Sequence, residues 1–314
     1  MSPARLREWL SRYGILLAFV VLAAALSILS PSFLEPSNLL NVLRQISVNA
    51  LLAFGMTTVI VGGGIDLSVG SVLAFSGALA AGAAMAGWAP ALAMIAALVL
   101  GAGMGLVNGF FVAGARIAPF IATLGGLTIF RGATLVYTDG RPITGLPDAF
   151  GVLGNGAFGG VPVPVWVMLG FLALTHFLLR YTGLGRNVYA VGGNEEAARL
   201  SGLPIVKVKL FTYAYAGLAS ALGALVLTGR LNSAQPTAGS GFELDAIAAV
   251  VVGGTSLSGG RGSVLGTFVG AAIIGVLNNG MNLLNVSAFY QQIVKGGVIL
   301  GALLIDRLVA TRKE

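Results

Sequence analysis

The sequence predicts an all-α membrane protein with about ten transmembrane helices. Two observations on composition favour this class: 56% of the 314 residues are hydrophobic and only 9% are charged, where a soluble domain carries about 25% charged residues. The third is 47 glycines at a mean hydropathy of +0.92, because small residues let helices pack closely in lipid. These values exclude a typical cytosolic enzyme, a disordered chain and a fibrous one.

Glycine, proline and single charges separate the apolar runs of the chain. These runs define the expected spans. These are residues 14–30, 46–61, 67–86, 90–114, 119–137, 165–179, 210–228, 244–254, 264–284 and 289–306. The first is interpreted as a span and not as a signal peptide, because it is long for one and more apolar runs follow it. Pro36 ends its helix, and residues 38–45 are expected to form a separate helix at the membrane surface. Since each span needs about 20 residues, the whole chain, 1–314, is one transmembrane domain.

The distribution of charge predicts the orientation, since Lys and Arg collect in cytoplasmic loops. With the N-terminus inside, most of the 18 cations fall on the cytoplasmic side: Arg5, Arg7, Arg12, Arg116, Arg180, Arg186, Arg199, Lys207, Lys209, Arg261, Arg307, Arg312 and Lys313. Loop 180–209 is then cytoplasmic, and the polar loops 139–164 and 229–243 are periplasmic. Ten spans return the C-terminus to the cytoplasm. This scattered pattern, not nucleic-acid binding, accounts for the net charge of +7.

Small residues and repeated segments indicate how the helices pack. Residues 80–87 and 101–105 are expected to be helix-packing faces. Residues 62–71 resemble residues 253–263, and a shorter Gly/Asn segment in the fourth span resembles one in the ninth. Because duplicated halves are common in transporters, an internal repeat is possible.

Asp66 lies in a glycine-rich break between two spans. A carboxylate at membrane depth is expensive and usually functional, so Asp66 could face a water-filled path. Alternatively, it caps the next helix, since its carboxylate would accept free N–H groups there. Both interpretations remain open.

Other polar residues inside spans have similar alternatives. Arg131 and Lys295 must face protein, water or a carboxylate, or extend to the outer interface. Asn108, Asn278 and Asn279 suit a path for a neutral polyhydroxyl solute, although hydrogen bonds between helices are the favoured alternative.

The sequence contains no motif of a catalytic, metal or nucleotide site. It has no cysteine and a single histidine, His176, which supports neither a metal site nor a proton relay and is interpreted as an interfacial residue. GxxxxGK[ST], HExxH and GxSxG are absent. A GxGxxG match at residues 154–159 has no strand before it, so it is rejected. We therefore expect no catalytic residues, cofactor or metal in this chain.

Residues 193–202 predict a short helix on the cytoplasmic surface, with helix formers between Asn194 as the N-cap and Gly202 as the stop. An ordered inner loop of thirty residues is unusual in so compact a chain. A lever that docks on a partner is therefore favoured over a solvated connector.

Over nearly its whole length the chain resembles the permease subunits of bacterial ABC sugar importers, in the ribose/xylose/galactose branch. The segments that carry the resemblance are GGIDLSVGS (63–71), PFIATL (119–124) with FRG (130–132), AVGGNEEAARLSG (190–202) and ELDAIAAVVVGGTSL (243–257). SAQPTAG (233–239) and LNNGMNLL (277–284) are most similar to the ribose members of that branch.

The resemblance implies an inner-membrane importer of a monosaccharide, with ribose as the expected sugar. It implies that a second permease copy completes the pore as a homodimer, that a periplasmic protein delivers the sugar, and that a cytoplasmic ATPase holds ATP and Mg. It also implies that the ATPase docks on Gly193, Asn194, Glu195, Glu196, Ala197, Ala198, Arg199 and Gly202. The EAA core is present, but Leu203-Pro204 follows at once where the wider pattern has a longer gap.

Topology and analogy together suggest two further sets of residues. Arg44, Arg141 and Arg230 are the only cations expected in outer segments, so they are candidates for docking the carboxylates of the binding protein. Asp66, Asn108, Asn278 and Asn279 are candidates for lining the path.

Two alternatives remain at this stage. One is an ion-coupled secondary transporter, which would need intramembrane carboxylates such as Asp66 and Asp245. The other is an ABC permease for another sugar, a nucleoside or a branched-chain amino acid.

Overall fold

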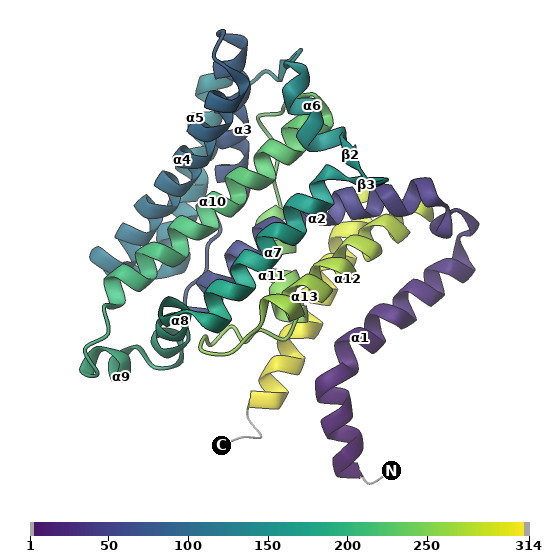
Figure 1. Cartoon of the computed structure of the whole chain (residues 1–314). Coiled ribbons are helices and arrows are strands. Elements are labelled where there is room, and N and C mark those ends of the chain that lie inside the picture. Colours follow the sequence, from purple (N-terminus) through teal and green to yellow (C-terminus); the bar gives the residue numbers. More distant parts are fainter. Residues whose placement is uncertain (1–2, 311–314) are drawn as a thin grey trace.

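The computed structural model describes the backbone of residues 3–310 and the side chains of residues 14–301 and 304. Its α-helices are α1 (Pro3–Leu29), α2 (Pro36–Val61), α3 (Val69–Met85), α4 (Pro90–Gly109), α5 (Pro119–Thr138), α6 (Asp148–Asn155), α7 (Val163–Tyr181), α8 (Gly183–Gly193), α9 (Glu195–Leu200), α10 (Ile205–Leu231), α11 (Phe242–Val252), α12 (Val264–Leu283) and α13 (Ala288–Ala310). The short elements are η1 (Pro31–Leu34), η2 (Phe110–Gly114), β1 (Ile143–Thr144), β2 (Ala157–Phe158), β3 (Val161–Pro162) and β4 (Ser233–Ala234). Figure 1 shows their arrangement.

The all-α membrane class is confirmed. Each expected span overlaps a helix, and within the described residues six helices are long and apolar enough to cross a bilayer: α2, α4 with η2, α5, α7, α10 and α12. Two further helices, Gly14–Leu29 within α1 and Val69–Met85, are also apolar but shorter. The number of crossings stays a prediction.

Helix α11, which matches the expected span 244–254, is too short to cross a bilayer alone. Its 11 residues extend about 16 Å at 1.5 Å each, roughly half of the ~30 Å hydrocarbon core. All its residues from Asp245 to Val251 are buried. It is therefore a half-length helix enclosed by protein, as membranes require where a helix is broken.

The expected separate surface helix at 38–45 is wrong. Residues 36–61 form one continuous helix, α2, because no glycine or proline separates the polar residues around Arg44 from the apolar run that starts at Ile46. Pro36 occupies its first turn, where a missing N–H costs nothing.

Both large loops contain more helix than the sequence suggested. The outer loop 139–164 includes α6 and the β2–β3 hairpin. In the inner loop 180–209, Thr182 caps α8 by accepting a hydrogen bond from the Gly185 N–H at 3.1 Å. Lys207 and Lys209 belong to α10, which begins at Ile205.

The long helix α10 lies in the centre and packs on α2, α3 and α4. The contact with α4 depends on glycines: a Cβ at Gly105 would overlap the Tyr213 carbonyl, and one at Gly217 would overlap the Gly101 carbonyl. This confirms residues 101–105 as a packing face. Residues 80–87 are also a packing face, since Ala80, Ala81, Ala83 and Ala84 cluster with Ala93 and Ala97 of α4.

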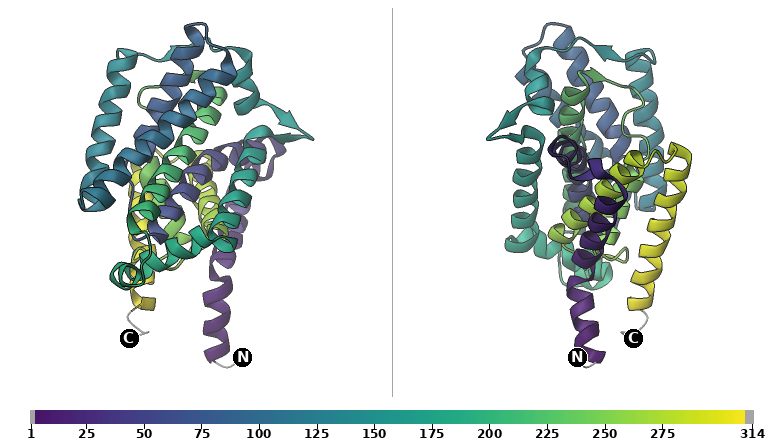
Figure 2. Two further views of the ribbon diagram at one scale, coloured as in Figure 1. Left: turned by 60° about the vertical axis from the view of Figure 1, so that its left-hand side comes forward. Right: turned by 90° about the vertical axis from the view of Figure 1, so that its right-hand side faces the viewer.

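The two ends of the bundle carry different loops. Both termini lie at the same end as α8 and α9 (Figures 1 and 2). At the opposite end, α6 lies beside the end of α10, and strand β1 pairs with β4 through Ile143 and Ala234, which joins the loops 139–164 and 229–243. This grouping is the one that the predicted orientation requires. Which end faces the cytoplasm stays a prediction.

Candidate functional site

Helix α9 forms where the sequence predicts it. The Asn194 side chain accepts a hydrogen bond from the Ala197 N–H at 2.9 Å, which satisfies one of the free donors at the helix start. The helix stops at Gly202, whose φ of +77° is unfavourable for residues with a side chain. Gly193 is the last residue of α8, so Asn194 alone separates the two helices.

Ion pairs hold α9 against α10. Glu195 contacts Lys209 of α10 at 2.6 Å and Arg199 at 3.1 Å, and Glu196 contacts Arg199 at 3.2 Å. The hydrogen bond from Lys209 lowers the pKa of Glu195. Ala198 is buried among α8 and α10 residues, whereas Leu200 is 82% exposed. The helix therefore has one anchored face and one face free for contact.

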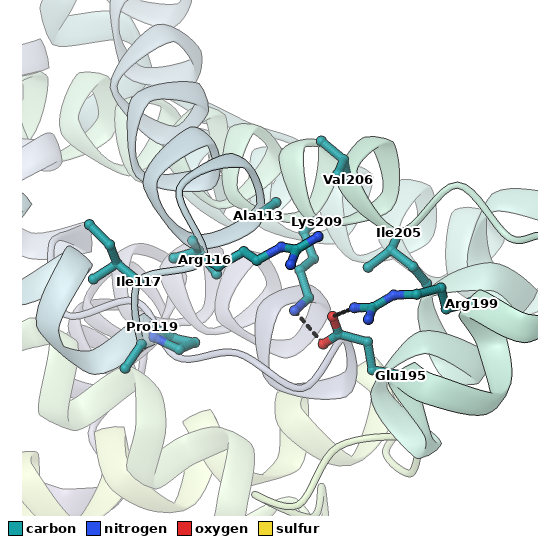
Figure 3. Close-up of a pocket in the computed structure, with 11 residues that line it drawn as sticks. Ala113, Arg116, Ile117, Pro119, Glu195, Arg199, Ile205, Val206 and Lys209 are labelled. Carbon is teal, nitrogen blue, oxygen red and sulfur yellow. Dashed lines mark hydrogen bonds and ion pairs between the residues drawn. The ribbon is translucent and has the colours of Figure 1, made fainter.

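A cavity of about 300 Å³ opens beside α9 (Figure 3). Arg116 and Ile117 reach it from the α4–α5 turn, Glu195 and Arg199 from α9, and Val206 and Lys209 from α10. Three cations and one carboxylate thus surround an opening with apolar walls. Among the side chains that the structure describes, no three His, Cys, Asp or Glu residues gather as metal ligands.

Glycines connect α8 to the two segments that resemble each other in sequence, residues 62–71 and residues 253–263. The Gly260 N–H donates to the Val61 carbonyl at 2.9 Å. A Cβ added at Gly192 would overlap the Val61 carbonyl, and one added at Gly259 would lie 2.6 Å from the Gly192 carbonyl oxygen and 3.0 Å from the Gly63 Cα. The segments 62–71 and 253–263 therefore touch, although the internal repeat itself stays a prediction.

A tyrosine on α8 strengthens this junction. The Tyr189 hydroxyl donates to the Gly262 carbonyl at 2.9 Å, so α8 is tied to the loop before α12 as well as to the end of α2. The sequence alone does not identify Tyr189 or Gly192 as functional residues. The available signal was the repeated Gly-Gly pairs at 63–64, 192–193 and 259–260.

Asp66 and Asn108 come together through Ser68. The Asp66 carboxylate accepts hydrogen bonds from the N–H and the hydroxyl of Ser68 at 2.8 and 2.7 Å, and the Asn108 amide donates to the Ser68 hydroxyl at 2.7 Å. All three are at most 1% exposed. The backbone donor to Asp66 is Ser68, the residue before α3, and not an N–H of α3 itself. Both interpretations of Asp66 stay predictions.

Asn278 and Asn279 lie near the other end of the bundle and have different neighbours. Asn279 exchanges amide hydrogen bonds with Asn38 at 2.8 and 3.1 Å, which is the expected contact between helices. Asn278 lines a pocket with Arg230, which lies at the end of α10. The four path candidates thus form two separate pairs, and their role in a path stays a prediction.

The three arginine candidates for docking do not form one cluster. Arg141 is exposed and lies 3.9 Å from Asp139. Arg44 donates to Asn41 at 3.2 Å and is near enough to Arg230 for the two cations to repel each other. Two of the candidates are therefore neighbours, and the third belongs to the loop before β1.

The cations inside spans face protein. Arg131 donates from one nitrogen to the carbonyls of Pro236 and Ala238 at 2.7 and 2.8 Å, and Lys295 pairs with Asp245 at 2.9 Å. Arg131 thereby holds the segment between β4 and α11. His176 packs edge-on against Tyr181 at the end of α7.

Comparison with known proteins adds a family and several near relatives. Residues 38–303 match the family described as branched-chain amino acid transport system / permease component. The ribose import permease protein of Bacillus subtilis is 55% identical over 300 residues, which cover 95% of this chain and 93% of the relative. That of Escherichia coli K12 is 52% identical over 305 residues, 96% of this chain and 95% of the relative. The D-allose transport system permease protein of E. coli is 40% identical over 311 residues, 98% of this chain and 95% of the relative.

Proposed function

Because the chain belongs to the branched-chain amino acid transport system / permease component family, we propose that it is the membrane subunit of an ATP-driven, binding-protein-dependent importer of ribose. As a permease component it is a transport subunit and not an enzyme. The proposal that the substrate is ribose rests on the identity of 50–55% with ribose import permeases along about 95% of the chain. Identity with the D-allose permease is 40% and with an L-arabinose permease 37%.

The inner end of the bundle supports coupling to a separate ATPase that holds ATP and Mg. Helix α9 presents Leu200 and the cation-lined cavity beside it, while its other face is fixed to α10 by Glu195. A segment of the ATPase that enters the cavity would push on α9, and α8 would pass the motion to the helix breaks through Gly192 and Tyr189. Residues 193–199 and Gly202 are therefore the coupling element of the proposal.

The proposal includes ten crossings, cytoplasmic termini and a homodimer in the inner membrane. Exposed apolar side chains along α5, among them Phe120, Ile121 and Ile129, would face lipid or the second copy. Arg44, Arg141 and Arg230 would receive carboxylates of the periplasmic binding protein. Reversing each charge should lower stimulation of the ATPase by that protein, and unchanged stimulation in all three variants would contradict this role.

The ion-coupled alternative has less support. Both carboxylates that it would use are engaged, Asp66 with Ser68 and Asp245 with Lys295. A coupling ion would have to displace these contacts.

The test is a gentle detergent purification of the tagged chain from its native membrane, followed by reconstitution of the recovered complex with the binding protein. We expect two copies of the chain, an ATPase with P-loops, and ATP-dependent ribose uptake. Glu196→Lys should release the ATPase, whereas Asp148→Lys on α6 at the other end should not. Purification of the chain alone under conditions that preserve known complexes, or ribose uptake driven by an ion gradient without ATP, would overturn the proposal.

A further inference from the structure

A second pocket, of about 180 Å³, lies near the outer end of the bundle among α2, α10, α11, α12 and α13. Eight of its eleven lining residues are polar or charged, and only Val48, Leu227 and Phe242 are apolar. Six of the polar groups carry the argument: Arg230, Asp245, Asn278, Asn282, Gln291 and Lys295. Typical pockets for drug-sized ligands are larger and mostly apolar, so this one suits a smaller and more polar molecule.

One side chain of the pocket, that of Asn278, has a hydrogen-bond acceptor without a partner. Asn278 is only 5% exposed, and its side-chain oxygen is buried with no hydrogen-bond partner. Buried acceptors are nearly always paired, because an unpaired one keeps its desolvation cost without compensation. Its neighbour Asn279 is paired with Asn38, so unpaired amides are not a general feature of α12. The Asn278 oxygen therefore marks a place for a donor from outside the chain.

The carboxylate in the lining and two of its amides are engaged by other lining residues. Lys295 pairs with Asp245 at 2.9 Å, and the Gln291 amide donates to the Asn282 oxygen at 2.8 Å. An amino-acid ligand would need an unpaired carboxylate for its ammonium group and an apolar niche for its side chain. A neutral molecule rich in hydroxyls needs neither, since each hydroxyl both donates and accepts.

Resting on the function proposed above, we propose that this pocket is a sugar-binding subsite of the permease, one in each copy. A sugar hydroxyl donates to the Asn278 oxygen there, and the polar groups of Asp245, Lys295 and Asn282 complete the contacts. The subsite lies at the end where Arg44 and Arg230 are candidates to meet the binding protein, so it is placed to receive the sugar first. It binds weakly, because tight binding would slow release toward the other side.

The test uses the full chain in lipid nanodiscs, without ATPase or binding protein, and D-ribose as the probe. Saturation-transfer NMR measures binding at millimolar ribose, with L-leucine and inorganic phosphate as competing probes. Asn278→Leu removes the free acceptor with little change of shape. Asn282→Leu removes an exposed amide, and this loss should leave the fold intact. The matched control is Thr267→Val, which removes a buried, paired hydroxyl from the same helix outside the pocket.

We expect ribose to bind the wild-type chain and the control alike, with affinity about three- to tenfold lower in Asn278→Leu and Asn282→Leu, the size of one lost hydrogen bond. If Asn278→Leu fails to fold, Asn282→Leu decides. Absence of binding, equal binding in all variants, or displacement of ribose by leucine or phosphate would overturn the inference. ATP-driven ribose uptake by the wild-type complex is measured in parallel: if uptake occurs without this binding, only the subsite fails, and if uptake is absent, the proposed function fails.

Discussion

At the scale of single residues, the polar groups that the bilayer would penalise are mostly used to join segments distant in sequence. Asn38 pairs with Asn279, Thr57 with Thr267, and Lys295 with Asp245. Composition identifies such residues as exceptional, because lipid offers them no partner. It does not identify the partner, which depends on how the helices pack. Asp66 illustrates this, since its neighbour Ser68, in the turn before α3, accepts a hydrogen bond from Asn108 of α4.

Removing the Asp66 carboxylate should destabilise the turn before α3. In Asp66→Ala the Ser68 N–H loses its acceptor inside the protein, so we expect a loss of about 1–3 kcal/mol. Asp66→Asn retains a carbonyl oxygen and should cost less. Thermal unfolding of the purified variants in detergent measures both. Equal stability of Asp66→Ala and the wild type would show that the network contributes nothing.

The attachment of α9 should depend on pH through Glu195. Its pKa is lowered mainly by Lys209, so the pair stabilises the folded state above the ordinary glutamate pKa of about 4.3. This stabilisation is lost as pH falls through the lowered value. The side chain of Glu195 is 40% exposed, so screening keeps the contribution below about 1 kcal/mol.

Hydrogen exchange of the α9 amides would measure this effect. At neutral pH, after correction for the intrinsic rates, Glu195→Gln should exchange faster than the wild type, and the two should converge in acid. Glu196→Gln is the control, because among the side chains that the structure describes Glu196 pairs with Arg199 alone, so its loss should have a smaller effect. A difference between wild type and Glu195→Gln that persists in acid would contradict the assignment to the ion pair.

At the scale of helices, hydropathy and the positions of glycine and proline predict most elements. The exact ends of the helices depend on capping and packing. Pro90 and Pro119 each lie at the start of a helix, as expected. Pro36 also starts a helix, α2, although it was expected only to end the preceding one. The apolar signal understated α2 and α10, because both helices continue through polar turns at one end. It overestimated the transmembrane character of α11, since a half-length helix whose residues 245–251 are buried in protein is as apolar as a short span.

Glycine packing between α4 and α10 provides a test at this scale. A Cβ at Gly105 would overlap the Tyr213 carbonyl, so Gly105→Ala should separate the two helices and cost about 1–3 kcal/mol. Gly103, on the same helix, has nothing within 4 Å of an added Cβ. Gly103→Ala should therefore be neutral or slightly stabilising, because alanine favours helix.

Thermal unfolding of both variants decides this point. A Gly105→Ala variant as stable as Gly103→Ala would mean that the close approach of α4 and α10 is not required.

At the scale of the whole molecule, the loops separate into two groups at opposite ends. Arg116, α8, α9 and the loop before α12 gather at one end, where Gly260 bonds to Val61 and Glu195 shares a cavity with Arg116. The β1–β4 pair and α6 gather at the other. This grouping agrees with the sidedness that the positive charges predict, and it places the coupling element far from the candidate sugar subsite.

Because the chain contains no cysteine, single cysteines can test which end faces the cytoplasm. Phe158→Cys lies in the outer hairpin and Leu200→Cys on α9; these positions are 74% and 82% exposed. In spheroplasts, a membrane-impermeant thiol reagent should label Phe158→Cys and should label Leu200→Cys only after lysis. The reverse pattern would invert the orientation.

The membrane class, the position of nearly every apolar helix, the capped helix α9 and the family resemblance all follow from the amino-acid sequence. Each of these depends on local composition, periodicity or a contiguous motif. Only the tertiary structure decided that Asn278 is unpaired while Asn279 is bonded, that α11 is enclosed, and that Glu195 contacts Lys209. These properties depend on which helices meet and at what distance, and contacts between residues far apart in the chain leave no periodic signal in the sequence of either partner.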